Sequence, residues 1–144
     1  PLLSVQRGAQ LQRRHHQLGY RAWTVRALSA IQDPRGLEVL QRAVANDIGP
    51  SVRQAAAYGL GRLQGHDENV LRPCMESLEL ACSDSEWSVR YAAVAALEQR
   101  LQQGLPCDLE RQAHALLQHR SQQEMDDTLV VRLRALLALE RLAA

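Results

Sequence analysis

Four arginines recur along the chain, each followed by a similar pattern of small and apolar residues. They are Arg21, Arg53, Arg90 and Arg132, with successive spacings of 32, 37 and 42 residues. Aspartates stand six, six and five residues before the last three of them, at Asp47, Asp84 and Asp127. A guanidinium binds a carboxylate through two parallel hydrogen bonds. The spacing favours a structural ladder in which each arginine pairs with an acid of an adjoining loop or repeat. The alternative is that one exposed arginine binds a ligand carboxylate.

Aromatic side chains are scarce, with two tryptophans, three tyrosines and no phenylalanine. We expect Trp87 in a loop and Tyr91 in the first turn of the next helix, so that the two share one surface. Tyr58 follows Arg53 by five residues, off the expected buried face. Because exposed aromatic residues often mark binding surfaces, we take Trp87, Tyr91 and Tyr58, with Arg53 and Arg90, as candidates for facing a ligand or partner. Packing between repeats is the alternative.

The remaining reactive side chains form no recognisable site. None of the five histidines belongs to a His-Glu dipeptide or a His-x-x-x-His pair, so we expect no metal. The three cysteines, Cys74, Cys82 and Cys107, lack metal-ligand spacing. The first two lie on one predicted helix about 12 Å apart, too far for a disulfide. We therefore expect reduced thiols and a cytoplasmic location.

Charge and hydropathy exclude several classes of function. The formal net charge is +1, so no strong field indicates nucleic acid or an anionic membrane. All 17 basic residues are arginine, which excludes a Schiff-base or P-loop lysine on this chain. Because no apolar run reaches 18 residues, we expect no membrane insertion.

The arginines belong to a longer internal repeat. Counting from each arginine, a small or apolar residue recurs at offsets 3 and 7, and offset 10 is apolar in all repeats except the one that has Arg100. These offsets trace one face of a helix. Helical self-similarity at this period predicts an all-α, HEAT-like helical-hairpin repeat solenoid. We expect a single domain over residues 1–144, with about four repeats and incomplete ends, which suggests a fragment of a longer chain.

Capping signals place the expected helices. Asp33 before Pro34 starts a second helix that reaches about residue 45. Ser51 and Ser88 are expected to cap the first helices of the next two repeats. Further helices are expected over residues 2–18, 20–31, 70–82, 107–119 and 129–142.

Three strings carry a resemblance to a known family. Gly19–Leu37 contains Arg-Ala-Trp, and Asp47–Gly61 contains Pro-Ser-Val-Arg-Gln-Ala-Ala-Ala-Tyr. Ser83–Val94 contains Glu-Trp-Ser-Val-Arg-Tyr-Ala-Ala. A generic HEAT repeat supplies Val-Arg and Ala-Ala but not the tryptophan-containing strings. Over roughly residues 19–101 the sequence resembles the E/F-type phycobilin lyases, above all their F-type subunit.

The resemblance implies an activity shared by two chains. E-type and F-type subunits form a heterodimer that binds an open-chain tetrapyrrole, such as phycocyanobilin, as its substrate. The pair attaches this bilin through a thioether to a cysteine of a phycobiliprotein α subunit, and no separate cofactor is implied. In that setting the five candidate residues would face the bilin or the partner. Catalytic residues are not identified.

Two points qualify the implied activity. The isomerising relatives carry an Asn-His-Cys-Tyr motif that this sequence lacks, so attachment without isomerisation is favoured. The alternative to a lyase subunit is a non-catalytic HEAT-repeat adaptor or chaperone that binds phycobiliproteins during assembly or disassembly.

Overall fold

The computed structural model describes residues 19–144, and the helix expected over residues 2–18 lies outside this range. The chain is helical over residues 19–31. The elements that follow are η1 (Pro34–Gly36), α2 (Leu37–Asn46), α3 (Pro50–Arg62), α4 (Glu68–Cys82), α5 (Trp87–Gln103), α6 (Cys107–Ser121) and α7 (Leu129–Ala143). The described residues contain no strand. The predicted all-α repeat architecture is confirmed.

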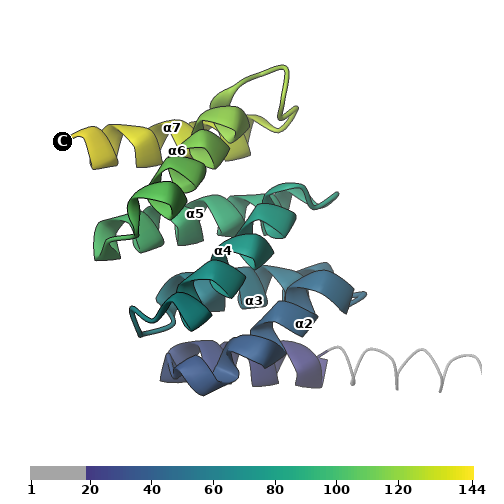
Figure 1. Cartoon of the computed structure of the whole chain (residues 1–144). Helices are drawn as coiled ribbons and strands as arrows, with labels where there is room; N and C mark the ends of the chain where they lie inside the picture. The colour runs from purple at the N-terminus through teal and green to yellow at the C-terminus, as the bar shows by residue number, and fades with distance from the viewer. Residues whose placement is uncertain (1–18) are drawn as a thin grey trace, which may run out of the picture.

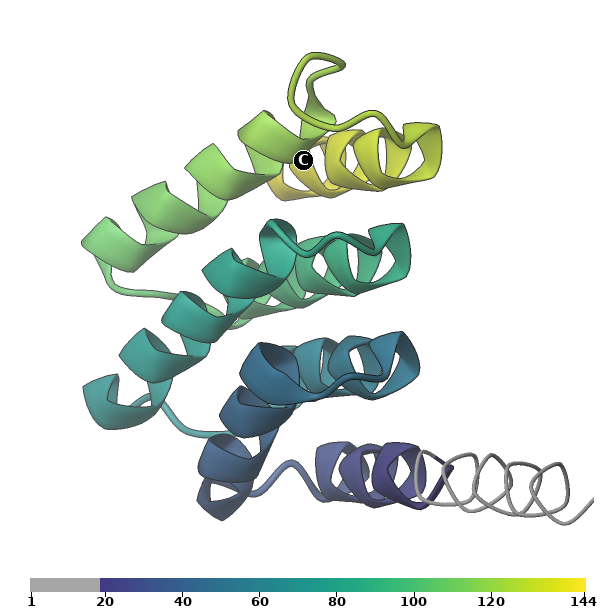
Figure 2. The same ribbon diagram turned by 90° about the vertical axis from the view of Figure 1, so that its right-hand side faces the viewer.

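The helices stack as successive hairpins in two layers (Figure 1). The residue 19–31 helix, α3, α5 and α7 form one layer, which we call the first-helix layer. The other layer contains α2, α4 and α6, and Figure 2 shows the two layers from the side. Each hairpin packs on the next, so neighbouring repeats share one continuous core.

The predicted face of offsets 3, 7 and 10 is buried in the middle of the stack. In α3 with its C-cap residue, and in α5, all of its residues are buried: Ala56, Leu60, Leu63, Ala93, Leu97 and Arg100. In the first described helix, Thr24 and Ile31 are instead exposed. That helix has a described neighbour in its own layer on one side only, so half of its face lacks a described cover.

Small residues let α3 and α5 approach closely. Ala55, Ala56, Ala57, Ala92, Ala93 and Ala96 are all buried. A Cβ added at Gly61 would lie 2.7 Å from the Cα and the Cβ of Ala96. The short distance between α3 and α5 therefore requires glycine at position 61.

Two of the expected caps are wrong by two residues. The Asp33 carboxylate does accept the Arg35 N–H at 2.9 Å, ahead of Pro34, as predicted. However, α3 begins at Pro50 after Gly49, so Ser51 is a helical residue rather than a cap. Likewise α5 begins at Trp87 after Glu86, so Ser88 is a helical residue rather than a cap. Trp87 is therefore helical and not in a loop. Proline at the start of α3 supplies a preset φ, and no side-chain cap is formed there.

Candidate functional site

The repeated arginines form a ladder along one edge of the stack. The first three of them each pair with an aspartate from the loop before the next first helix: Arg21 with Asp47 at 2.8 Å, Arg53 with Asp84 at 2.8 Å and Arg90 with Asp126 at 2.9 Å. Each pair uses both carboxylate oxygens. The predicted structural ladder is confirmed, and it ties each repeat to its successor.

A second set of bonds ties each arginine to its own loop. Arg53, Arg90 and Arg132 donate through Nη1 to the backbone carbonyl six residues earlier, that of Asp47, Asp84 and Asp126. The distances are 2.9, 2.8 and 2.7 Å. The last aspartate of the ladder is therefore Asp126, at 2.9 Å from Arg90. Asp127, the expected member, makes only a longer ion pair with Arg90 at 3.5 Å. The Asp127 side chain is 96% exposed. A constant spacing of six residues was the sequence signal for the correct choice.

Electrostatics keep the ladder aspartates ionised. Burial acts to raise the pKa of Asp84, but the hydrogen bonds from Arg53 and from the Glu86 backbone N–H outweigh it and hold the pKa below its ordinary value. The pKa of Asp126 is lowered by the same balance of burial against Arg90 and the Thr128 N–H. Both carboxylates therefore favour the charged form that pairs with an arginine of the chain.

Arg53 and Arg90, two of the five candidate residues, are accordingly engaged within the chain. The Arg90 residue is buried and the Arg53 side chain is 15% exposed. Arg90 also donates to the Thr128 hydroxyl at 3.0 Å. Their assignment to a ligand-facing or partner-facing surface stays a prediction, and the ladder leaves little of either guanidinium free to meet a ligand.

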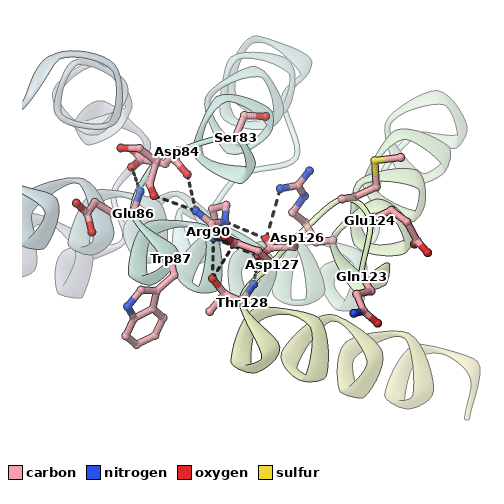
Figure 3. Close-up of a pocket in the computed structure, with 13 residues that line it drawn as sticks. Ser83, Asp84, Glu86, Trp87, Arg90, Gln123, Glu124, Asp126, Asp127 and Thr128 are labelled. Carbon is pink, nitrogen blue, oxygen red and sulfur yellow. Dashed lines mark hydrogen bonds and ion pairs between the residues drawn. The ribbon is translucent and has the colours of Figure 1, made fainter.

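The Arg90 end of the ladder opens into a cavity of about 540 Å³, which we call the loop pocket (Figure 3). Its charged lining consists of Asp84, Glu86, Arg90, Arg120, Glu124, Asp126 and Asp127. Five carboxylates against two guanidiniums make this pocket acidic. Trp87 also lines it and is 49% exposed. In Figure 3 its indole projects away from the Arg90 and Asp126 side chains.

The other aromatic candidates lie on the outer side of the first-helix layer. Tyr91 stands one turn after Trp87 in α5, so the two share a face. Tyr58 lies on the adjacent α3, and both tyrosines are half-buried against the core. Burial, followed by the proximity of Tyr91, raises the pKa of the Tyr58 phenol. The structure thus brings the three aromatic candidates onto neighbouring helices, while the two arginines belong to the ladder.

The sequence interpretation missed a second cavity in this layer. It has a volume of about 460 Å³, lies between the residue 19–31 helix and α3, and contains Tyr58 in its wall. Arg26 and Arg62 also line it. A signal existed, because Arg26 stands five residues after Arg21 as Tyr58 does after Arg53.

A buried acid was also missed. Glu98 on α5 is 3% exposed and accepts a hydrogen bond from Arg134 on α7 at 2.5 Å. Arg141 lies 3.6 Å from its other carboxylate oxygen. Among the described residues, this oxygen and Arg134 Nη1 are buried side-chain atoms without a hydrogen bond. The triad joins α5 to α7.

The described residues contain no bridged cysteine pair, no cluster of metal ligands and no membrane-spanning helix. Cys74 and Cys82 are buried and unbridged, and burial raises the pKa of Cys82 to about 12. Cys107 is exposed. Across residues 19–144, no three potential metal ligands cluster and no helix is long and apolar enough to cross a membrane.

Comparison with known families matches two short segments. Residues 20–46 match the PBS lyase HEAT-like repeat, and residues 74–99 match the HEAT repeat. Both segments fall on helical hairpins of the structure.

Similar proteins extend this match along the chain. The chain is 45% identical to the bilin biosynthesis protein RpcF of Synechococcus sp. over 88% of its own length and 61% of the relative. It is 39% identical to a phycobilisome maturation protein of Synechococcus elongatus, over 90% of the chain and 64% of the relative. It is 45% identical to the phycocyanin alpha phycocyanobilin lyase CpcF of Synechocystis sp., over 58% of the chain and 42% of the relative.

A solved structure decides the family. The complex of CpcE and CpcF of phycocyanin lyase from Nostoc sp. contains a chain that is 40% identical, with a TM-score of 0.76. The match covers 84% of our chain and 72% of that chain. The present chain belongs to the F-type phycobilin lyase subunits. The predicted family resemblance is confirmed, and the F-type repeat extends well beyond the strings that indicated it. The chain spans less than two thirds of the length of the curated relatives cited above.

Proposed function

We propose that this chain is one subunit of a phycobilin lyase that acts with an E-type partner. The observation that carries the proposal is its membership of the F-type subunits, because the related solved structure is a complex of CpcE and CpcF. The name of the Synechocystis relative gives phycocyanobilin as its substrate and phycocyanin alpha as its acceptor. We extend this class of substrate and acceptor to the present chain, with the reaction in the cytoplasm of a cyanobacterial-type cell.

The reaction is an addition. The acceptor cysteine sulfur forms a bond to the exocyclic ethylidene carbon of ring A, the double bond is lost, and a proton ends on the adjacent ring carbon. No oxidant or leaving group is needed. A lyase accelerates such a step by holding the flexible bilin in one conformation and presenting ring A to the thiolate. Because the sequence lacks the Asn-His-Cys-Tyr motif, we propose attachment without isomerisation.

The first-helix layer is the surface we favour for this role. Trp87, Tyr91 and Tyr58 offer aromatic faces on adjacent helices. A bilin has a flat apolar face that stacks on such side chains, and its N–H groups and propionates need polar partners at the edges. The alternative placement is that this layer contacts the E-type partner.

A second function, that of an adaptor or chaperone, is favoured by one observation. The chain is 39% identical to a relative named as a phycobilisome maturation protein. Such a protein would bind phycobiliproteins without transferring pigment. It would need the same repeat surface but no site that orients ring A.

Co-expression separates the two functions. The chain, an E-type partner, a phycobiliprotein α subunit and bilin synthesis enzymes are produced together, and each lyase chain is omitted in turn. Covalent pigment is read as zinc-induced fluorescence of the α subunit on a denaturing gel. The lyase function predicts a signal that requires both chains. Co-purification of the α subunit without any covalent signal would support the adaptor and contradict the lyase.

A further inference from the structure

Two arginines differ from every other arginine in the described part of the chain. Arg26 and Arg62 alone make no recorded hydrogen bond or ion pair within residues 19–144. All the others bond to a carboxylate, a backbone carbonyl or a histidine of the chain itself. Arg26 and Arg62 are both exposed. Two guanidiniums therefore remain available for an external anion.

Both arginines line the same cavity, which we call the Arg26–Arg62 pocket. Its volume is about 460 Å³, and its other lining residues are Ser29, Ser51, Gln54, Ala55 and Tyr58. None of these carries a carboxylate. Among residues 19–144 the pocket thus presents two positive charges with no counter-ion in its lining, which is the environment that attracts an anion.

The neutral lining residues suit a carboxylate on an organic molecule. The pKa of the Tyr58 phenol is raised because of burial, so the phenol stays protonated at neutral pH. Its O–H can therefore donate a hydrogen bond to an oxyanion. Ser51 and Gln54 add polar groups beside it. Ser29 is buried and already donates to the Val25 carbonyl at 2.7 Å, so it forms part of the wall. Ala55 and the Tyr58 ring supply apolar contact.

We propose that the Arg26–Arg62 pocket binds a propionate carboxylate of the bilin. The inference rests on the proposed lyase function and adds to it a specific anchoring site. A volume of this size lies within the range of small-molecule pockets, which are about 300–1,000 Å³. It is larger than a single carboxylate needs, so the propionate can bring part of its pyrrole ring against Ala55 and Tyr58.

Charge argues against the loop pocket as the site of this contact. Five carboxylates line the loop pocket, and its Arg90 and Arg120 are both bonded to Asp126. A propionate placed there would meet like charge with no free guanidinium to offset it. Tyr58 instead links the Arg26–Arg62 pocket to the aromatic face formed with Tyr91. A bilin anchored at Arg26 and Arg62 would therefore extend along the first-helix layer.

Equilibrium binding of two pigments tests the proposal. The purified chain, alone and in complex with its E-type partner, is titrated with phycocyanobilin and with its dimethyl ester, and binding is followed by pigment absorbance. We expect the free acid to bind at least roughly tenfold more tightly, as for one charge-assisted hydrogen bond. Arg26→Gln and Arg62→Gln should each weaken binding of the acid and leave binding of the ester unchanged.

Matched variants keep the test specific. Arg111→Gln removes the same charge from an exposed position on α6 and should leave both affinities unchanged. Tyr58→Phe should weaken binding of the acid alone. Thermal melts check that every variant remains folded.

The outcomes separate this inference from the lyase function. Equal affinities for acid and ester, or an acid preference that survives both arginine substitutions, would overturn the propionate site and leave the lyase function standing. Binding of neither pigment would also overturn it. If covalent attachment still requires both chains while the two arginine variants only weaken E-type binding, the pocket receives a carboxylate of the partner instead. Absence of attachment in the co-expression experiment would overturn the lyase function itself.

Discussion

The guanidinium of Arg100 on α5 donates two hydrogen bonds to the backbone carbonyl of Leu60 in α3, at 2.9 and 2.6 Å. Arg100 is 1% exposed. The carbonyls in the last turn of a helix lack intrahelical partners, and the helix C-terminus favours a cation. The same Leu60 oxygen accepts the Cys74 thiol at 3.0 Å. One buried arginine therefore caps α3 from the next repeat.

Substitution of Arg100 should lower stability sharply. We expect Arg100→Met to reduce the free energy of unfolding by about 2 kcal/mol, since it removes charge-assisted hydrogen bonds from a buried carbonyl. Arg111→Met, on the exposed side of α6, should change it by less than about 0.5 kcal/mol. Urea denaturation followed by circular dichroism measures both. Equal stabilities of the two variants would show that the cap is not needed.

The ladder predicts how stability depends on pH. The pKa of Asp84 is lower in the folded chain than its ordinary value, so its contribution is fully present above about pH 4. The contribution decreases as pH falls through the lowered folded-state pKa, because the carboxylate must take up a proton. Asp84→Asn should therefore lower stability by about 2 kcal/mol at pH 7 and make the loss between pH 7 and pH 3 smaller than in the natural chain.

Glu76→Gln provides the control for this pH series. Glu76 is exposed on α4 and makes no recorded ion pair among the described residues, so its replacement should leave the pH profile unchanged. Urea midpoints at both pH values give the comparison. Asp84→Asn and the natural chain losing stability in parallel would contradict a role for Asp84 in the ladder.

Close packing of α3 against α5 predicts an unusual effect at Gly61. Alanine raises helix propensity by about 1 kcal/mol relative to glycine. At Gly61, however, the new Cβ would lie 2.7 Å from Ala96, which forces the helices apart. We expect Gly61→Ala to destabilise the chain by about 1–3 kcal/mol. At Gly19 an added Cβ meets no atom of residues 19–144 within 4 Å, so Gly19→Ala should be neutral or stabilising. Thermal melts that rank the two variants in the opposite order would refute close packing at Gly61.

The aromatic surface predicts a defect in pigment attachment without loss of the fold. Trp87→Ala and Tyr91→Ala should each lower the initial rate of attachment by roughly tenfold, as expected for removal of an aromatic contact from a binding surface. Leu80→Ala removes an exposed apolar side chain on α4, in the other layer, and should leave the rate unchanged. If both aromatic variants are folded and attach bilin at the natural rate, these residues do not belong to the site.

The repeat pattern allowed the fold to be predicted because helical periodicity depends only on local spacing. Ala56, Leu60 and Leu63 stand at the expected offsets and are fully buried. Arg100 stands at the corresponding offset of the next repeat and is buried as well. The hydrogen bonds from Arg100 to the Leu60 carbonyl could not be predicted from the spacing, since that contact depends on the register between α3 and α5.

The candidate site could be predicted less completely for a related reason. Sequence spacing indicated that Arg53 and Arg90 pair with acids, but the choice of Asp126 over Asp127 is made by the path of the loop before α7. Arg26 and Arg62 lie in different helices and form one cavity only when the two repeats stack. The sequence pattern describes each repeat separately, so it did not predict which residues of two repeats come into contact.

The central claim, that this chain is the F-type half of a two-chain lyase, is tested most directly by a titration. A fixed amount of E-type partner is mixed with phycocyanobilin and a phycobiliprotein α subunit, and the initial rate of covalent attachment is measured as this chain is added. We predict a rate that rises with added chain and levels off at an equimolar ratio. A rate that is the same with and without the chain would contradict the claim.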